Sequence, residues 1–331
     1  MKKLLSKIIV IVSGILIVSW CSIFVISHAV YHRSFMATVA ECYLRITNKG
    51  DLASTQNAEA YMKTIAKTQD EPYSLDTKKY KSSAKMTEFK GTQMITFGDS
   101  EKSSHTVLFL HGGAYVNNVL SNHLDFCDKL SQKTNAYVMI PLYPLAPNNT
   151  YDKTFNLLTD LYTDMLTNKQ NDITIMGDSA GGGLSIAFCE YLNKKGLAKP
   201  EHLIGLSPWV DISMTTSDYE KYQRADPSLG REGLIAMGKA WAGELDTNNY
   251  LVSPINGDVS GLPDTTLFVG TRELFYPDVI RFYDILQKAG VKSTLITGEG
   301  LNHVYPLFPI PEAKEALNQI SNVITNSKAA K

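Results

Sequence analysis

The sequence predicts an α/β fold in which a mostly parallel central sheet is flanked by helices. From residue 91 onwards, short apolar segments typical of buried strands alternate with longer amphipathic segments typical of helices. Such alternation implies crossover connections, which make the strands parallel and place helices on both faces of the sheet. A glycine-rich pentapeptide lies between one predicted strand and one predicted helix. In parallel sheets this position, at the carboxyl end of a strand, is where reactive groups collect.

The strands are expected at 93–97, 106–110, 136–140, 173–176, 203–206, 266–269 and 293–297. The helices are expected at 122–133, 155–166, 184–193, 278–289 and 312–324. Gly196 and Gly290 follow two of these helices, as glycine commonly does at a helix end.

Length and composition indicate a globular chain with an ample core. Its 331 residues are 44% hydrophobic and 20% charged, which suits one large domain or one domain plus a small accessory layer. The net charge of −1 gives no reason to expect a nucleic-acid partner. Four scattered cysteines without paired spacing argue against a disulfide framework and a zinc site. No metal or organic cofactor is expected, and the sequence leaves the oligomeric state open.

The N-terminus is predicted to anchor the protein in a membrane. No Asp, Glu, Lys or Arg occurs from residue 8 to 32, and as a helix this segment would be about 37 Å long, enough to cross a bilayer. Residues 1–7 form a basic tail that should stay cytoplasmic. Residues 8–30 would then be a single-pass anchor, and the remainder of the chain would lie outside the cell membrane. The alternative is a signal peptide cleaved near Ala29, after which the protein is secreted.

Two further segments are expected to form a helical cap. Residues 31–90 have helix-like apolar spacing interrupted by a polar loop at 68–85, and a simple stalk is the alternative interpretation. Residues 91–331 form the predicted catalytic domain. Within it, residues 208–262 break the strand–helix alternation and should form a cap insertion over the sheet edge.

The candidate nucleophile is Ser179. It lies in Gly177-Asp178-Ser179-Ala180-Gly181, a G-x-S-x-G motif that follows a predicted strand and opens into a predicted helix. Glycines suit so tight a turn because they tolerate close backbone approach and strained dihedral angles. The start of the helix directs free N–H groups at an oxyanion forming near the serine. Taken alone, the motif is equally compatible with an ordinary glycine-rich turn.

A second glycine-rich loop is the candidate oxyanion hole. His111, Gly112 and Gly113 come directly after a predicted strand, so this loop and Ser179 should emerge at the same sheet edge. Adjacent glycines allow successive N–H groups to point the same way. The expected oxyanion donors are the N–H groups of Gly112, Gly113 and Ala180. A Gly-Gly turn without function is the alternative.

His303 and Glu273 are the expected base and acid. His303 follows the last predicted strand, and Glu273 follows the strand before it. The order Ser, acid, His along the chain is the one typical of α/β-hydrolases. Asp264 and Asp278 are the other carboxylates near that strand; Asp264 should lie at the opposite sheet edge, and Asp278 should cap a helix.

The sequence resembles the hormone-sensitive-lipase-like (fold-3) branch of the α/β-hydrolase superfamily, the bacterial esterases with an added cap, from about residue 92 to 310. The matching segments are residues 111–114, 143–147, 177–182, 207–211, 226–227, 261–263 and His303. Ala114 stands where the family has a third glycine, and the acid is Glu instead of the more frequent Asp. The resemblance implies an α/β-hydrolase fold and assigns His111, Tyr115, Asp178 and Trp209 to the conserved motifs or the substrate pocket.

The expected function is therefore that of a membrane-anchored serine carboxylesterase. It would hydrolyse short-chain acyl esters, acetyl to butyryl, through a Ser-His-Glu triad and an acyl-enzyme. Its partners would be a small-molecule ester and the lipid bilayer, through residues 8–30. A deacetylase or amidase acting on a glycan or small molecule with the same triad is one alternative. A ligand-binding homologue without catalysis is another.

Overall fold

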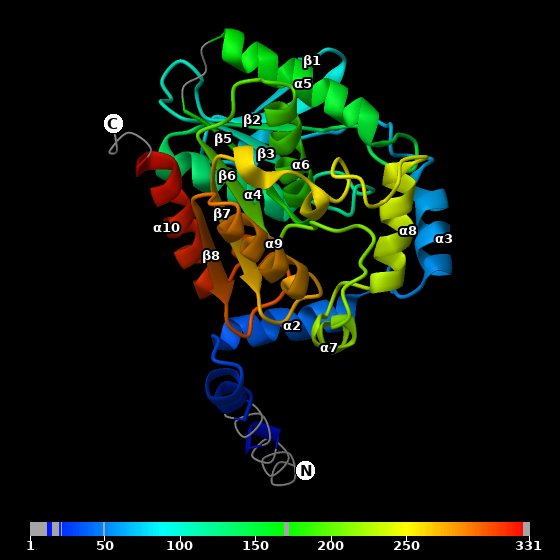
Figure 1. The fold of residues 1–331 in the computed structure, drawn as a ribbon. Coiled ribbons are helices and arrows are strands. Elements are labelled where there is room, and N and C mark those ends of the chain that lie inside the picture. Colours follow the sequence, from blue (N-terminus) through cyan, green and yellow to red (C-terminus); the bar gives the residue numbers. More distant parts are fainter. Residues whose placement is uncertain (1–11, 15–19, 21, 49, 169–171, 327–331) are drawn as a thin grey trace.

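The central element of the computed structural model is an eight-stranded sheet that is parallel except at one edge (Figure 1). The structure describes residues 12–14, 20, 22–48, 50–168 and 172–326. The order across the sheet is β1-β2-β4-β3-β5-β6-β7-β8, and the β1–β2 and β2–β4 pairs are antiparallel. The strands are β1 (Lys85–Phe89), β2 (Thr92–Phe97), β3 (Thr106–Leu110), β4 (Tyr137–Pro141), β5 (Ile173–Asp178), β6 (His202–Leu206), β7 (Asp264–Gly270) and β8 (Ser293–Gly298).

Helices cover both faces of this sheet. On one face lie α4 (Ser121–Thr134) and α10 (Pro311–Thr325), and on the other lie α5 (Tyr151–Thr167), α6 (Ser179–Lys194) and α9 (Tyr276–Lys288). Strand residues alternate between two hydrophobic clusters, as the period of two in a pleated strand requires: Leu108 packs on the α5–α6 side, and Phe109 on the α4–α10 side. The sheet is therefore buried on both faces, as expected for parallel strands.

All seven predicted strands are present within one or two residues, and the sheet has one strand that was not predicted. That strand, β1, lies in the segment assigned to the helical cap and loop. It is an edge strand with only partly buried or exposed side chains, so it lacks the apolar run by which strands are recognised. Lys90 and Gly91 connect it to β2 with φ values of +47° and +81°. Two positive φ angles are typical of a tight hairpin turn, but Lys-Gly is a weaker turn signal than Asn-Gly.

The cap consists of four helices from two parts of the chain. The helices α2 (Phe35–Thr47) and α3 (Thr55–Ile65) come from the N-terminal segment, and α7 (Tyr219–Ala225) and α8 (Arg231–Ala242) from the insertion between β6 and β7. Helix α3 packs against α8, and α2 runs beside α7 at the edge toward which β7 and β8 point (Figure 1). The cap therefore covers the carboxyl ends of the strands.

The predicted membrane anchor falls largely outside the described residues. Of residues 8–30, the structure describes 12–14, 20 and 22–30, with a π-helical turn at Ile26–Val30. Within the described ranges, no helix is both long enough and apolar enough to cross a membrane.

Candidate active site

Ser179 occupies the sharp turn between β5 and α6. Its φ is +52°, a left-handed conformation that costs a non-glycine residue energy and is characteristic of residues held at functional sites. The turn can be this tight because Gly177 and Gly181 flank it. A Cβ at Gly181 would lie 2.0 Å from the carbonyl oxygen of Leu110, on the neighbouring strand β3. The sequence thus folds here into the strand–turn–helix arrangement that the motif predicts.

His303 links Ser179 to Glu273. Its Nε2 lies 2.9 Å from Ser179 Oγ, and its Nδ1 lies 3.1 Å from Glu273 Oε1. With a proton on Nδ1 donated to Glu273, Nε2 is free to accept the proton of the serine hydroxyl. The three residues come from the ends of β5, β7 and β8, so the sheet edge brings them together in the predicted order. All three are buried.

Ser207, directly after β6, connects Glu273 to the loop that carries His303 through hydrogen bonds. Its hydroxyl donates to Glu273 Oε2 at 2.7 Å and accepts the backbone N–H of Val304 at 3.0 Å. Glu273 Oε2 also accepts the N–H of Gly270 at 2.9 Å. Ser207 was not predicted as a site residue, although its position directly after a parallel strand, in a segment matching the family, was an available signal.

The environment of His303 has opposing effects on its pKa. Burial alone would lower that pKa, but the negative charge of Glu273 and the hydrogen bond to it raise it, with smaller contributions from Asp226 and Asp178, and the net pKa lies above the ordinary value. An imidazole of raised basicity accepts a proton from a serine hydroxyl more readily.

The two other candidate carboxylates have different partners. Asp264 begins β7 at the opposite edge and forms an ion pair with exposed Lys292, as expected from its position. The prediction that Asp278 caps α9 is wrong. Its carboxylate instead accepts the hydroxyls of Thr216, at 2.5 Å, and of Tyr219 from the cap, and no side chain caps that helix. Asp278 therefore ties the insertion to the catalytic domain.

The predicted oxyanion loop requires one correction. The N–H of Gly112 donates to Asp178 Oδ1 at 2.9 Å, so in this structure it is committed to a carboxylate and is not available to an oxyanion. His123 holds the other oxygen of Asp178 through Nε2 at 3.2 Å, because its Nδ1 accepts the N–H of Leu120. Asp178 thus ties the oxyanion loop to the serine turn. The candidate donors that remain are Gly113 and Ala180, the latter in the first turn of α6, where N–H groups lack helical acceptors.

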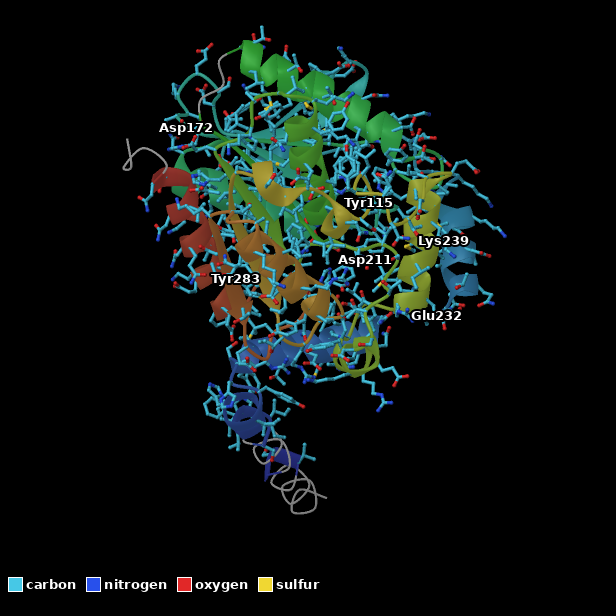
Figure 2. All side chains as sticks on the ribbon, in the orientation of Figure 1. Tyr115, Asp172, Asp211, Glu232, Lys239 and Tyr283 are labelled. Atoms are coloured by element: carbon cyan, nitrogen blue, oxygen red, sulfur yellow. The ribbon has the colours of Figure 1, made fainter. Side chains whose placement is uncertain are left out.

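His111, Tyr115 and Trp209 do not line an open pocket. Each is at most 1% exposed, so in this structure these three members of the predicted motif or pocket set are part of the core. Tyr115 lies inside the fold, in contrast to Glu232 and Lys239 on the outer side of α8 (Figure 2). Aromatic rings stack in a continuous row behind the triad, in the order Trp241, Tyr115, Trp209 and Phe275, the last of which packs edge-on against His303 at 5.1 Å.

Asp226 in the cap is a second residue that sequence reasoning did not single out as part of the site. Its Oδ2 accepts the N–H of Leu274, next to Glu273, at 2.9 Å, while Oδ1 accepts the N–H groups of Ser228 and Leu229. It therefore joins the cap to the loop that carries the acid. Among the described residues, no group of three or more His, Cys, Asp or Glu side chains is arranged to hold a metal ion.

Comparison with known proteins identifies the class. The family described as the alpha/beta hydrolase fold matches residues 107–307. An esterase from Acinetobacter venetianus is 31% identical over 229 residues, covering 68% of this chain and 76% of that protein. An acetyl-hydrolase from Streptomyces hygroscopicus is 25% identical over 222 residues, covering 66% of this chain and 74% of that protein. The crystal structure of an esterase from the bacterial hormone-sensitive lipase family superimposes with a TM-score of 0.77 at 22% identity, covering 89% of this chain and 99% of the other.

The chain belongs to the α/β-hydrolase fold family, whose sequence pattern matches more than half of its length. It is therefore an enzyme of the carboxylesterase type. The family expected from the sequence is confirmed.

Proposed function

We propose that the protein hydrolyses short-chain carboxylic esters with Ser179 as nucleophile, His303 as base and Glu273 as the acid that orients the base. The observation that carries this proposal is the unbroken chain of contacts from Ser179 Oγ through the imidazole of His303 to Glu273. Two of the named relatives are called esterase and acetyl-hydrolase, which favours an ester with a small acyl group.

In the proposed reaction, His303 Nε2 takes the hydroxyl proton as Ser179 Oγ attacks the ester carbonyl carbon. The carbonyl oxygen becomes an oxyanion, which the N–H groups of Gly113 and Ala180 stabilise; losing one such donor typically costs about 3 kcal/mol. His303 then gives its proton to the departing alcohol, leaving an acyl-serine. Water, deprotonated by the same imidazole, attacks the acyl carbon. The bond from that carbon to Ser179 Oγ then breaks, the imidazole returns the proton to Oγ, and the carboxylic acid is released.

A hollow in the cap supports the proposal that the alcohol part of the substrate is polar. It measures about 860 Å³ and lies between α2, α7 and the start of α8. That is within the range of small-molecule sites. Its lining includes Asp226, whose carboxylate bonds the backbone beside Glu273, so the hollow adjoins the acid loop. Most of its other lining groups are polar, among them Asn48, Gln223 and Ser228. We therefore propose a sugar-sized or otherwise hydrophilic alcohol.

The deciding experiment compares the wild type with Ser179→Ala. The variant should fold, and should lose both ester hydrolysis and covalent labelling by a fluorophosphonate probe. Ser185→Ala is a matched control, because Ser185 is buried on the same helix and its hydroxyl bonds only the backbone of Gly181. Labelling retained in Ser179→Ala would refute the assignment. A panel of matched acetyl esters and amides separates the esterase from an amidase or deacetylase.

We also propose that residues 8–30 anchor the protein in the cell membrane with the catalytic domain outside. The support is the uncharged run from residue 8 to 32 behind Lys2, Lys3 and Lys7. Protease added to intact cells should digest the catalytic domain. A domain protected until the cells are broken contradicts this orientation, and a soluble form that begins after Ala29 indicates a cleaved signal peptide.

A further inference from the structure

The outward face of α2 is apolar and has no partner among the described residues. Met36, Val39, Tyr43 and Ile46 follow one another at intervals of three, four and three residues, so they lie on one side of the helix. They are 47%, 40%, 65% and 83% exposed. We call these four side chains the α2 stripe. Exposed Cys42 lies beside it.

No charged side chain interrupts the α2 stripe. The two charged residues of the helix are Glu41, which is buried against the catalytic domain, and Arg45, whose guanidinium bonds Glu41 and the carbonyl of Ala225. A surface helix normally carries polar residues on its outward face. Clustered exposed apolar side chains instead mark a surface that contacts a protein or a membrane.

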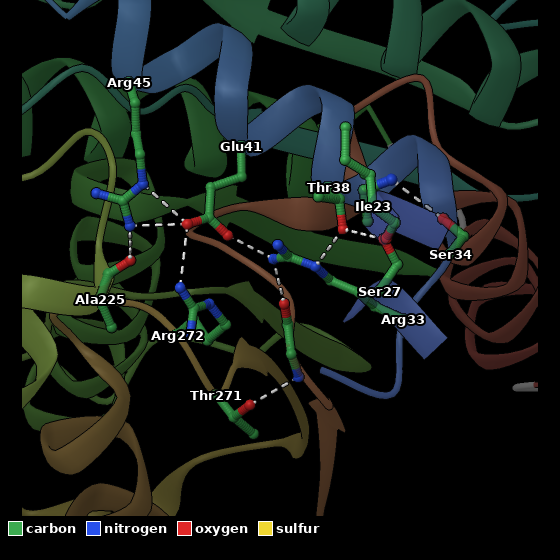
Figure 3. A network of polar contacts seen from close by, with 12 residues as sticks. Ile23, Ser27, Arg33, Ser34, Thr38, Glu41, Arg45, Ala225, Thr271 and Arg272 are labelled. Atoms are coloured by element: carbon green, nitrogen blue, oxygen red, sulfur yellow. Dashed lines mark hydrogen bonds and ion pairs between the residues drawn. The ribbon is translucent and has the colours of Figure 1, made fainter. Parts of the chain in front are cut away.

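The helix cannot turn its stripe inward, because polar contacts fix its orientation (Figure 3). Thr38 on the inner side accepts from Ser27 Oγ at 2.7 Å and from Arg33 Nε at 3.0 Å. At its start, Ser34 donates from its backbone and its hydroxyl to Glu312 of α10, at 2.6 and 2.8 Å. These hydrogen bonds therefore keep the α2 stripe on the outward side of the helix.

The surroundings of the stripe indicate a lipid surface. The described helical residues that precede α2 also expose apolar side chains, including Phe24, Val25 and Val30 at 41%, 58% and 61%. They belong to the uncharged run proposed above as the anchor and extend from the domain on the side where α2 lies (Figure 1). Beside Val30 lies a hollow whose lining includes three tyrosines, two basic residues and one acidic residue: Tyr31, Tyr222, Tyr276, Lys221, Arg272 and Glu299. Tyrosines with basic residues are typical of the membrane–water interface.

We infer that the α2 stripe lies in the headgroup layer of the bilayer, directly beside the anchor. This rests on the proposed anchor but not on the proposed reaction. Helices of this kind lie in the membrane plane with the apolar face buried about 5–10 Å deep. Because α2 covers the sheet edge that carries Ser179, Glu273 and His303, the catalytic edge then faces the membrane.

The test places a fluorescent reporter on the stripe of the full-length chain. Trp20 is exposed and is replaced by Phe, whereas Trp209 and Trp241 are fully buried and remain as background. In this Trp20→Phe chain, Tyr43→Trp is introduced, and the protein is reconstituted into phosphatidylcholine vesicles whose lipids are brominated near the top of their acyl chains. The Tyr43→Trp emission should be strongly quenched relative to vesicles without bromine.

A matched control separates contact from nonspecific quenching. Lys288→Trp in the same background puts the reporter at the exposed end of α9, at the opposite sheet edge, and should show no added quenching. Adding Val39→Glu and Ile46→Glu to the Tyr43→Trp chain should abolish the quenching, because charges resist burial in the acyl layer.

Two outcomes overturn the inference. One is Tyr43→Trp emission that bromine leaves unchanged. The other is unquenched emission together with efficient cross-linking through Cys42 between two chains, which assigns the stripe to a second copy instead of lipid. Loss of esterase activity alone changes neither the quenching nor the cross-linking result. The test therefore distinguishes an error in the proposed reaction from an error in the proposed membrane contact.

Discussion

Replacing Glu41 with Gln tests the ion-pair network that joins α2 to the loops carrying Glu273 and His303. Glu41 is 6% exposed, and its carboxylate contacts Arg33 at 2.6 Å, Arg45 at 2.7 Å and Arg272 at 3.0 Å (Figure 3). Arg33 also donates to the carbonyl of Gly300 at 2.7 Å, on the loop that leads to His303. Arg272 directly precedes Glu273. The carboxylate thus neutralises cations attached to both catalytic loops.

The loss in the free energy of unfolding depends on which arginine is left without a counter-ion. The Arg33 side chain is only 2% exposed, and removing one partner of a buried pair typically costs about 3–5 kcal/mol. The Arg45 side chain is 42% exposed, so its share should be under about 1 kcal/mol. Gln keeps the shape of the side chain and one acceptor. Glu41→Gln should therefore lower the free energy of unfolding by about 3 kcal/mol, near the lower end of that range.

Urea denaturation of the full-length protein, with Arg45→Gln as the matched control, measures this difference. Arg45→Gln should change the free energy of unfolding by less than about 1 kcal/mol. Turnover of a soluble ester should also fall in Glu41→Gln, and Glu41→Asp should restore part of it. If Glu41→Gln is as stable as Arg45→Gln, the network does not hold the cap, and the reasoning is refuted.

The same carboxylate predicts a pH dependence. Burial alone would raise the pKa of Glu41, but hydrogen bonds from Arg272, Arg45 and Arg33 lower it overall. A depressed folded-state pKa contributes stability that is complete above the unfolded pKa and is lost as the pH falls through the folded pKa. The stability of wild type should therefore decline in acid more steeply than that of Glu41→Gln, and parallel curves would contradict the assignment.

Three further substitutions test other parts of the site. Glu273→Gln should lower kcat by about 10⁴-fold, since the tautomer of His303 is no longer enforced. It should also move the acid limb of the kcat/KM profile to lower pH, because the carboxylate that raises the pKa of His303 is gone. A normal kcat would exclude Glu273 as the acid. Ala114→Gly should raise the free energy of unfolding in urea by about 1 kcal/mol, because Ala114 has a φ of +55°, a left-handed conformation that glycine adopts without the cost that a Cβ brings. A destabilised variant would show that the alanine methyl group packs favourably. Asp278→Asn should cost about 1 kcal/mol in the same assay and leave kcat near normal, since it weakens hydroxyl bonds to the cap; a large loss of kcat would make Asp278 the catalytic acid.

The parts of the structure that the sequence predicts are those governed by local pattern. The strand that precedes Ser179, β5, and its neighbour β3 are mostly apolar because both faces of the sheet are buried, so their positions are predicted closely. The serine turn carries its own glycine signature. For Glu273, its place after β7 and before His303 in the chain is enough to distinguish it from Asp264, which begins the same strand.

What the sequence does not predict depends on contacts between distant segments. Nothing near Gly112 indicates that its N–H is bonded to Asp178, because the two are 66 residues apart and meet only when β3 and β5 pair. The family resemblance assigns Tyr115 and Trp209 to the motifs or the substrate pocket, and in the structure they stack on each other and are buried. Whether a given aromatic side chain lines a pocket or packs in the core depends on how the layers assemble around it.

Glu41 shows how such long-range contacts bear on function. In the sequence it is one acid on a mostly apolar helix, and its three partners come from residue 33, residue 45 and residue 272. Once folded, it fixes α2 to the loops of the acid and the histidine, while the opposite side of the same helix presents the α2 stripe. One helix thus connects the proposed membrane contact to the geometry of the triad. Any force that lifts α2 from the domain must first expose the buried pair of Arg33 and Glu41, which is costly. The site and the membrane-facing surface should therefore move as one body.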